Sequence, residues 1–450
     1  MLTVVNANWV SPGGVVVSGV VAADGPLLRL LPGQTHPAVR RSGHVIDGSG
    51  LLVLPGCIDG HVHFREPGQS RKEGIRNGSE AALAGGVTTV LDMPNNRPPC
   101  TTAARLERKR DLFARKCAVN WGLFVQASPW MARRGDSGNK GDAEREEGAR
   151  GPGTGWGCVG AKVYLAKSSA LPALPDPTAL VRVFSSFPLV AVHAEDERLF
   201  RADAGLPHHE ARPIESIAAA LGLVEKVLVS LPAPCRPRVV ICHASSTVEI
   251  DWLGRMKRAG FDVWGETCAQ YLYLTQDDYL REGARLKVNP PLRTADDALA
   301  LREALRDGTL DFLSTHLAPH LLHEKSSASP PSGMPGIEWY LPNAWRLVDS
   351  GVLGLPRLTE ITSGAAARCY GLVRRDGLRT GNHADFVLVR RHGTTFPERT
   401  VITRAGYCPY GQAGSQERGG LQVVATVVGG ELRYHEGRFL PGPPGQEVSR

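Results

Sequence analysis

Short apolar segments recur through the middle of the chain, and most of them are followed by a stretch that is compatible with a helix. The eight segments comprise residues 57–64, 87–94, 119–128, 158–165, 189–195, 238–245, 261–268 and 310–316. Strand signals that alternate with helices are typical of parallel sheets. Eight of them in succession predict an α/β fold, a (β/α)8 barrel of the TIM type.

Both ends of the chain have a different pattern, in which short apolar segments are broken by turn residues. These segments lie at 15–21, 26–32, 45–54, 385–389 and 421–428. Apolar runs between turn signals predict β-strands. We expect the two ends to pair into one small β-sandwich domain, with residues 1–54 and 376–450 as its two parts and the barrel at 55–375.

One stretch, residues 131–156, interrupts the barrel pattern after the third predicted strand. It is dense in Gly, Arg, Asp and Glu and has no apolar periodicity. Because such a composition offers little apolar surface to bury, we expect a charged surface insertion. A solvated loop without a function of its own is the more ordinary interpretation of this stretch.

Composition narrows the class of protein. The chain has 450 residues, enough for one large domain and an accessory one. Its nine cysteines are scattered without a C-x-x-C pair, which indicates neither a disulfide framework nor a zinc ribbon. The net charge of +7 is spread along the chain rather than gathered into a basic stripe. Neither a membrane span nor a signal peptide is indicated. We therefore expect a cytoplasmic protein that binds neither nucleic acid nor membranes.

Histidines stand near the C-terminal ends of several predicted strands, where barrel active sites are built. His61 and His63 are two residues apart on a strand, so their side chains point to the same face and can reach one metal ion. His193 and His243 each close an apolar run. A single histidine in such a place is more often a core or surface residue. Four of them at the ends of barrel strands favour a metal site.

Lys162 lies in the apolar segment 159–165, which places it inside the barrel or at its rim. Buried lysines are rare without a partner, so one interpretation is a salt bridge to a neighbouring acid. The other is a deprotonated amine that combines with carbon dioxide to form an anionic carbamate. Such a group can bridge two divalent ions as a carboxylate does.

Several longer motifs resemble those of dihydroorotases, which are cyclic amidohydrolases of the metal-dependent hydrolase superfamily. The motifs are HVHFREPG at 61–68, GGVTTV at 85–90, DMPNN at 92–96, KVNPPLR at 287–293 and DFLSTHLAPH at 311–320. The resemblance runs through nearly the whole chain in order and spacing, so chance matching is remote.

The resemblance implies two Zn²⁺ ions per chain. His61 and His63 would hold one ion, His193 and His243 the other, and a carboxylated Lys162 would bridge them. The pair would bring the pKa of a bridging water near neutrality and polarise an amide carbonyl, so that hydroxide attacks a cyclic amide.

The resemblance also assigns substrate binding to Arg65, Asn95, Asn289 and His320. The implied reaction is the reversible cyclisation of N-carbamoyl-L-aspartate to (S)-dihydroorotate in pyrimidine biosynthesis. A guanidinium at position 65 can grip the substrate carboxylate in two places, whereas a lysine cannot. Arg65 therefore favours dihydroorotase over hydantoinases, whose substrates need no such partner.

The chain departs from the family pattern on the eighth strand. Dihydroorotases typically have Thr-Asp-His-Ala-Pro-His there, and the aspartate contacts the metal and acts as general base and acid. In Thr315-His-Leu-Ala-Pro-His320 the aspartate position is taken by His316. A neutral histidine can bind metal and shuttle a proton, but it brings no negative charge. Our hypothesis is that His316, as metal ligand and catalytic residue, makes a weak or inactive dihydroorotase. The seventh-strand segment 266–272 also lacks two adjacent histidines common in relatives and has Gln270 and Tyr271 instead.

Three interpretations stay open. The first is an active dihydroorotase, with a homodimer as in many relatives. The second is a non-catalytic homologue that serves as a partner of aspartate transcarbamoylase, which His316 favours and the intact substrate residues oppose. The third is another ring-opening amidohydrolase, an allantoinase or a hydantoinase, which the Lys162 segment and residues 331–338 favour and Arg65 opposes.

Overall fold

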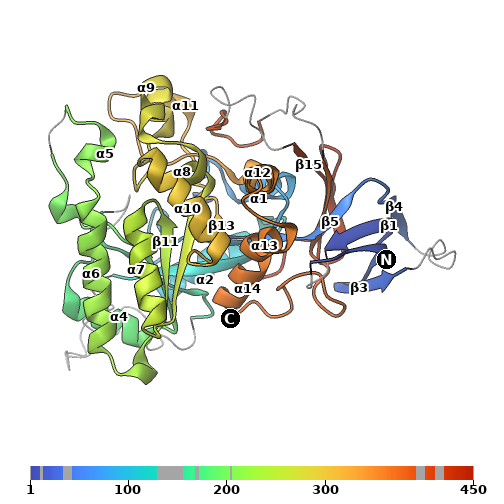
Figure 1. Cartoon of the computed structure of the whole chain (residues 1–450), viewed down its shortest axis with the longest axis horizontal. Coiled ribbons are helices and arrows are strands. Elements are labelled where there is room, and N and C mark those ends of the chain that lie inside the picture. Colours follow the sequence, from blue (N-terminus) through green and yellow to red (C-terminus); the bar gives the residue numbers. More distant parts are fainter. Residues whose placement is uncertain are drawn as a thin grey trace.

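The computed structural model describes residues 2–10, 14–33, 43–128, 156–167, 172–202, 205–391, 401–410 and 420–448. Within these residues, an eight-stranded sheet pairs each strand in parallel with the next one along the chain (Figure 1). Its strands are β6 (Cys57–Val62), β7 (Val87–Asp92), β8 (Asn120–Gln126), β9 (Gly160–Tyr164), β10 (Leu189–His193), β11 (Arg238–Ala244), β12 (Val263–Cys268) and β13 (Phe312–Ser314). The predicted succession of eight barrel strands is confirmed.

Contacts between the first and last strands close the barrel. Val62 forms an isolated parallel bridge with Leu317, and the backbone N–H of His63 donates to the Leu317 carbonyl at 2.8 Å. The buried carboxylate of Asp59 accepts the backbone N–H of Thr315 at 3.0 Å and also the Thr315 hydroxyl. These bonds fix the chain after β13 beside the histidines of β6.

Helices follow most of the barrel strands. The longer ones are α1 (Ile75–Ala84), α2 (Ala103–Lys116), α4 (Pro177–Ser186), α6 (Glu215–Ser230), α7 (Thr247–Arg258), α10 (Ala295–Asp307) and α12 (Tyr340–Asp349). Helix α6 buries Ile217, Leu221, Val224 and Leu228, a spacing that forms one apolar stripe. Helix α10 begins at a capping box and ends at Gly308, whose φ of 92° suits glycine.

Short helical segments build the loops around these elements. They are η2 (Glu197–Leu199), α5 (His208–Ala211), η3 (Ala233–Cys235), α8 (Ala269–Tyr273), η4 (Gln276–Asp278), α9 (Tyr279–Glu282), η5 (Gly283–Leu286), α11 (Leu322–Lys325), η6 (Ile337–Trp339), α13 (Leu355–Thr359), the π-helical η7 (Glu360–Gly364) and α14 (Ala365–Tyr370). No helix in the described part of the chain is long and apolar enough to span a membrane.

The two ends of the chain form one nine-stranded sheet, seen at the right of Figure 1 beside the barrel. Its strands are β1 (Leu2–Val10), β2 (Val16–Asp24), β3 (Leu27–Pro32), β4 (His44–Asp47), β5 (Leu52–Pro55), β14 (Phe386–Arg391), β15 (Leu421–Val428), β16 (Glu431–His435) and β17 (Arg438–Phe439). Strand β5 joins the two ends because it pairs in parallel with β1 and antiparallel with β14. The expected β domain is confirmed, and its strands follow one hydrogen-bonded path with β4 beside β1.

The β domain is connected directly to the strand that carries the first histidine of the site. Strand β5 ends at Pro55, and β6 begins at Cys57 and carries His61. Strand β15 also touches the barrel, since the Thr426 hydroxyl donates to the carbonyl of Leu83 on α1. The expected charged insertion at 131–156 lies outside the described residues except for Trp156.

Candidate metal centre

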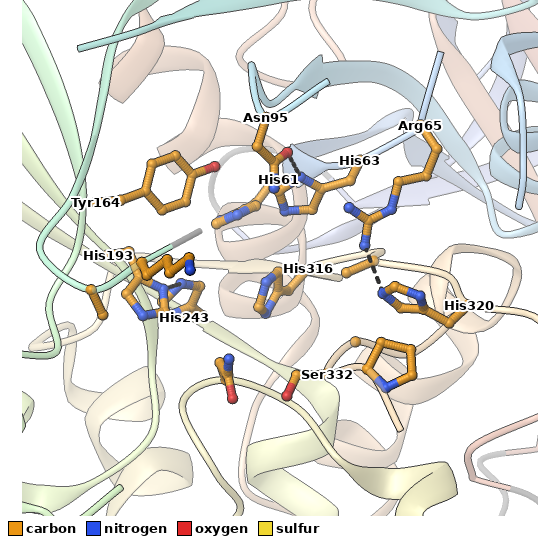
Figure 2. Close-up of a pocket in the computed structure, with 16 residues that line it drawn as sticks. His61, His63, Arg65, Asn95, Tyr164, His193, His243, His316, His320 and Ser332 are labelled. Carbon is orange, nitrogen blue, oxygen red and sulfur yellow. Dashed lines mark hydrogen bonds between the residues drawn. The ribbon is translucent and has the colours of Figure 1, made fainter. Parts of the chain in front are cut away.

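A cavity of about 250 Å³ opens at the carboxyl ends of the barrel strands (Figure 2). Every sequence-predicted site residue except Lys162 lines it. The lining residues are His61, His63, Arg65, Asn95, Tyr164, Ala166, Lys167, His193, His243, Asn289, His316, Ala318, His320, Pro331, Ser332 and Gly333. The structure therefore brings together predicted site residues that are far apart in the sequence, such as His61 and His320.

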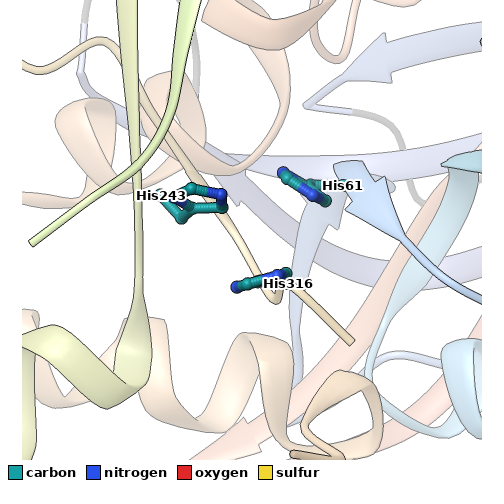
Figure 3. A group of neighbouring side chains, drawn as sticks. All are labelled: His61, His243 and His316. Carbon is teal, nitrogen blue, oxygen red and sulfur yellow. The ribbon is translucent and has the colours of Figure 1, made fainter. Parts of the chain in front are cut away.

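Three imidazoles form the centre of the cavity (Figure 3). The ring centroids of His61 and His316 are 4.7 Å apart, those of His243 and His316 4.6 Å, and those of His61 and His243 5.2 Å. One ring nitrogen of each residue lies within 4.8 Å of the others. His63 and His193 flank this group, with centroids 5.6 Å from His316 and 4.7 Å from His243 respectively.

Polar partners orient the histidines from behind. The Nδ1 atom of His61 lies 2.5 Å from the Glu266 carboxylate, and that of His63 lies 2.6 Å from the Asn95 side-chain oxygen. The Nε2 atom of His193 lies 2.8 Å from Glu195. A partner on one ring nitrogen fixes the ring, and in His61 and His63 it leaves the other nitrogen for a metal ion. The Nδ1 atom of His193 lies 3.0 Å from Nε2 of His243.

Burial keeps the central histidines neutral. Desolvation lowers the pKa of His61, His63, His243 and His316 well below 6.5, and the nearby charge of Lys162 lowers it further. A neutral imidazole has a free lone pair, which is the form that binds a metal ion. The histidines are therefore ready to act as ligands at neutral pH.

The donor set fits a divalent transition metal. The Nδ1 atoms of His243 and His316 and the Glu266 Oε2 are buried and make no hydrogen bond within the described residues. Unpaired buried polar atoms are costly, and a bound cation would satisfy them. Imidazole nitrogens are preferred ligands of zinc and similar ions.

Lys162 lies beneath this group, fully buried on β9. Its amine is 2.7 Å from the Cys242 sulfur and 5.4 Å from the ring centre of Tyr164. Among the described residues, the amine forms no salt bridge with a carboxylate within 4.0 Å, so that simpler interpretation finds no partner. Burial is the main cause that lowers the pKa of His61, His63, His193, His243 and His316, and the nearby Lys162 amine adds to it.

Three residues of the cavity have an unusual backbone conformation. The φ angles of Arg65, His243 and His316 are 63°, 44° and 50°, a region that residues other than glycine rarely adopt. Such conformations persist where the surrounding structure imposes them, and they are concentrated at functional sites.

The substrate-binding candidates line the same cavity as the histidines. Arg65 is 6% exposed, and its guanidinium lies 3.2 Å from Nε2 of His320. Burial lowers the pKa of Arg65 to about 10, so it stays charged at neutral pH. The side-chain oxygen of Asn289 lies 3.0 Å from Nε2 of His208. No Asp or Glu lines the cavity among the described residues, so its charge is positive.

The second departure from the family pattern leaves the packing intact. Gln270 donates to the Thr315 carbonyl at 3.4 Å and accepts from the Tyr410 hydroxyl at 3.2 Å. The Tyr271 hydroxyl donates to the Pro290 carbonyl at 2.8 Å. Gln270 and Tyr271 are therefore both buried and hydrogen-bonded at this position.

Sequence reasoning assigned no role to several buried residues that support the site. Glu195 and Glu266 orient histidines, Asp59 ties the first and last strands together, and Tyr164 directs its hydroxyl into the cavity in Figure 2. Asp59 and Tyr164 stand two residues from His61 and Lys162 on the same strands. A polar residue at every second position of a buried strand is the signal that would have indicated them.

Comparisons with known proteins agree with this arrangement. Residues 52–170 match the amidohydrolase family. The chain is 32% identical to dihydroorotase from Bacillus subtilis over 407 residues, which cover 88% of this chain and 90% of the relative. It is 31% identical to allantoinase from Rubrobacter xylanophilus over 469 residues, which cover 99% and 97%. L-hydantoinase from Arthrobacter aurescens has the same fold, with a TM-score of 0.83 at 24% identity and coverage of 100% and 99%.

The barrel with histidines at its strand ends defines a hydrolase of the metal-dependent type. Together with the similarity to curated relatives over most of its length, it shows that the chain belongs to the amidohydrolase family. The resemblance to dihydroorotases seen in the sequence is confirmed, because two of the similar curated proteins are dihydroorotases. An allantoinase is also among the similar proteins.

Proposed function

We propose that this protein is a cytoplasmic dihydroorotase that interconverts N-carbamoyl-L-aspartate and (S)-dihydroorotate in pyrimidine biosynthesis. The observation that carries the proposal is Arg65, a buried guanidinium that faces the histidine group across the cavity. Dihydroorotate bears a carboxylate on its ring. When this carboxylate enters the cavity it loses hydration, and a buried cation compensates for that loss.

The asparagines support the same substrate class. The Asn95 oxygen contacts Nδ1 of His63, and the Asn289 oxygen contacts Nε2 of His208. Because the Asn289 oxygen faces an imidazole nitrogen, the amide NH₂ group of Asn289 can donate to a substrate in the cavity that this residue lines. With Arg65 and His320, the cavity offers donors to a substrate rich in carbonyl and carboxylate oxygens.

In this proposal two Zn²⁺ ions bind to the chain. His61 and His63 would hold one ion and His193 and His243 the other, with His316 and a carboxylated Lys162 as further ligands. When bound, the ions would polarise the amide carbonyl and favour ionisation of water. The chain's own part is to orient the ring through Arg65 and the asparagines, and to accept a proton at a ring nitrogen of His316.

The absence of an aspartate at position 316 favours a second candidate, a non-catalytic partner of aspartate transcarbamoylase. The allantoinase relative favours a third, hydrolysis of a cyclic ureide without a ring carboxylate. Neither of these two candidates gives Arg65 a substrate carboxylate to bind, and this counts against both.

A substrate panel separates these candidates. Zinc-loaded protein would be assayed in both directions with dihydroorotate and N-carbamoyl-L-aspartate, and in hydrolysis with allantoin, hydantoin and 5,6-dihydrouracil. We expect the highest kcat/KM with the carboxylate-bearing pair. Faster hydrolysis of allantoin or hydantoin would overturn the proposal. If no substrate is turned over and light scattering detects a complex with aspartate transcarbamoylase, the role as a non-catalytic partner is supported. In size-exclusion chromatography, we expect the protein alone to elute as a homodimer.

A further inference from the structure

Lys72 contacts the side of His320 that faces away from the substrate-binding cavity. It lies on the loop between β6 and α1 and is 6% exposed, but it does not line the cavity. Its amine is 2.8 Å from Nδ1 of His320 and 3.2 Å from Glu324. Glu324 is itself held at the start of α11 by the backbone N–H of Leu321. Lys72 is therefore a fixed donor rather than a mobile surface charge.

This contact determines where His320 carries its proton. Both neighbours of the ring, the Lys72 ammonium and the Arg65 guanidinium, have only donors, and the ammonium is the closer, at 2.8 Å from Nδ1 against 3.2 Å from Nε2 to the guanidinium. The Glu324 carboxylate lies farther from Nδ1, at 3.6 Å, so we assign Nδ1 as the acceptor of the Lys72 hydrogen bond. A neutral imidazole has one donor and one acceptor nitrogen, which leaves the proton on Nε2. The ring is neutral because burial, followed by Arg65 and Lys72, lowers the pKa of His320 to about 2. The backbone carbonyl of Ser332 also favours an N–H on this ring.

The Nε2 atom then faces a second donor. It lies 3.2 Å from a guanidinium nitrogen of Arg65, which likewise has no acceptor. Two donors at this distance do not satisfy each other, but both can donate to one oxygen placed between them. With the opposite tautomer, His320 would accept from Arg65, and the pair would offer one donor fewer.

We propose that Lys72 is a positioning residue that holds the proton of His320 on Nε2, so that His320 and Arg65 together donate to the carboxylate of the substrate. The part of this inference that concerns the substrate carboxylate rests on the proposed function, whereas the part that concerns the tautomer of His320 does not. It assigns specificity to a lysine that does not touch the cavity.

The tautomer can be measured without any substrate. In protein labelled with ¹⁵N-histidine, the signal of His320 is identified by its loss in His320→Gln. We expect the wild type to show a protonated Nε2 and an unprotonated Nδ1, and Lys72→Met to shift toward the other tautomer. Lys72→Arg, which keeps the donor, should retain the wild-type pattern. A protonated Nδ1 in the wild type would overturn the proposal whatever the enzyme's substrate.

Kinetics test the consequence for substrate binding. We expect Lys72→Met to raise the KM for dihydroorotate about tenfold with little change in kcat, and Lys72→Arg to restore it. His320→Gln, which keeps a donor near the Nε2 position, should weaken binding less than His320→Asn. An unchanged KM in Lys72→Met, or an equal rise for dihydroorotate and the uncharged 5,6-dihydrouracil, would overturn the role in specificity. If the wild type does not bind dihydroorotate at all, the proposed function fails, whereas the tautomer measurement still decides the role of Lys72.

Discussion

The imidazole rings of His243 and His316 face each other at 4.6 Å between centroids, inclined by 31°. Both residues have positive φ angles, so the backbone at the ends of two different strands turns the rings toward one centre. The family places an aspartate where His316 stands. The histidine joins the ligand group geometrically, but it brings no negative charge to a cavity that no carboxylate lines within the described residues.

Replacing His316 with aspartate should therefore raise activity. An ionised carboxylate beside the metal ions offsets their charge and is a better proton acceptor than an imidazole next to cations. General acid–base groups commonly contribute about 10²–10⁴-fold, so we expect His316→Asp to raise kcat for dihydroorotate by about 10²-fold. Steady-state assays of zinc-loaded wild type and variant measure this effect.

The matched control for this substitution is His316→Asn, which has the size of the aspartate but neither its charge nor its basicity. It should not exceed the wild-type rate. If the wild type turns over substrate as fast as His316→Asp, the idea that His316 weakens the site is wrong.

Arg65→Lys should separate charge from geometry. A lysine keeps the positive charge but cannot form two parallel bonds to a carboxylate. Hydrogen bonds to charged groups contribute about 1.5–3 kcal/mol, so we expect KM for dihydroorotate to rise about 10- to 100-fold. The exposed Arg71→Lys on the same loop is the control and should leave KM unchanged. An equal KM in Arg65→Lys and wild type would remove Arg65 from carboxylate recognition.

Carboxylation of Lys162 predicts a carbon dioxide requirement. When apoprotein is loaded with zinc in ¹³C-bicarbonate, we expect one carbamate signal by ¹³C NMR and two zinc ions per chain. Lys162→Met should abolish the signal and lower the zinc content to one or none, because the bridge is lost. Lys167→Met is the control, since Lys167 lines the same cavity. Two ions per chain in Lys162→Met would contradict a bridging role.

Much of the fold could be predicted because the barrel strands are apolar and bounded by turn residues. The segment expected at 189–195 contains β10, Leu189–His193, with His193 at its end. The barrel then brings the candidates together, since the carboxyl ends of its strands share one face. The contacts that close the barrel could not be predicted, because no local pattern encodes the Val62–Leu317 bridge or the bond between Asp59 and Thr315.

The orientation of the site residues could not be predicted from sequence. That Glu266 stands behind His61, or Lys72 behind His320, depends on contacts between residues about 200 or more positions apart. The positive φ of His316 could not be predicted either, because that conformation is uncommon for residues other than glycine, although histidine adopts it more often than most. The motifs indicated which residues line the site, whereas the tertiary structure determines which atoms of these residues face the cavity.

A buried ion pair stabilises the loop that carries Asn95. Lys109 on α2 lies 2.5 Å from Asp92 and donates to the Met93 carbonyl at 2.8 Å, and both charged groups are fully buried. Lys109→Met leaves the Asp92 charge uncompensated, so we expect the free energy of unfolding to fall by about 3–5 kcal/mol. Lys109→Met combined with Asp92→Asn should recover part of this loss. Urea unfolding would contradict the prediction if the single and double variants were equally stable.

The segment 401–410 is attached to the barrel through a carboxyl group with a pH-dependent charge. Glu73 accepts the Thr403 hydroxyl and the Asn77 amide, and burial raises its pKa from 4.5 to about 7. Between these values the folded chain holds a proton that the unfolded chain releases, so stability falls as pH rises from about 4.5 to 7. Below that window the carboxyl is protonated in both the folded and the unfolded state. Above it the carboxylate is charged in both states, and the full cost of burying that charge lowers the stability of the folded protein.

Glu73→Gln imitates the protonated carboxyl at every pH. Relative to wild type, it should gain stability as pH rises through this window and reach a plateau of up to about 3 kcal/mol near pH 8, since each pKa unit corresponds to about 1.4 kcal/mol. Thermal unfolding of both proteins between pH 5 and 8 measures the difference, and the exposed Glu431→Gln should show none. A stability difference that is constant over this range would show that Glu73 ionises in the folded protein as it does in the unfolded chain. Since Glu338 binds the backbone N–H groups of Ile402 and Thr403 and also raises the pKa of Glu73, Glu338→Gln should reduce the pH-dependent part of the difference.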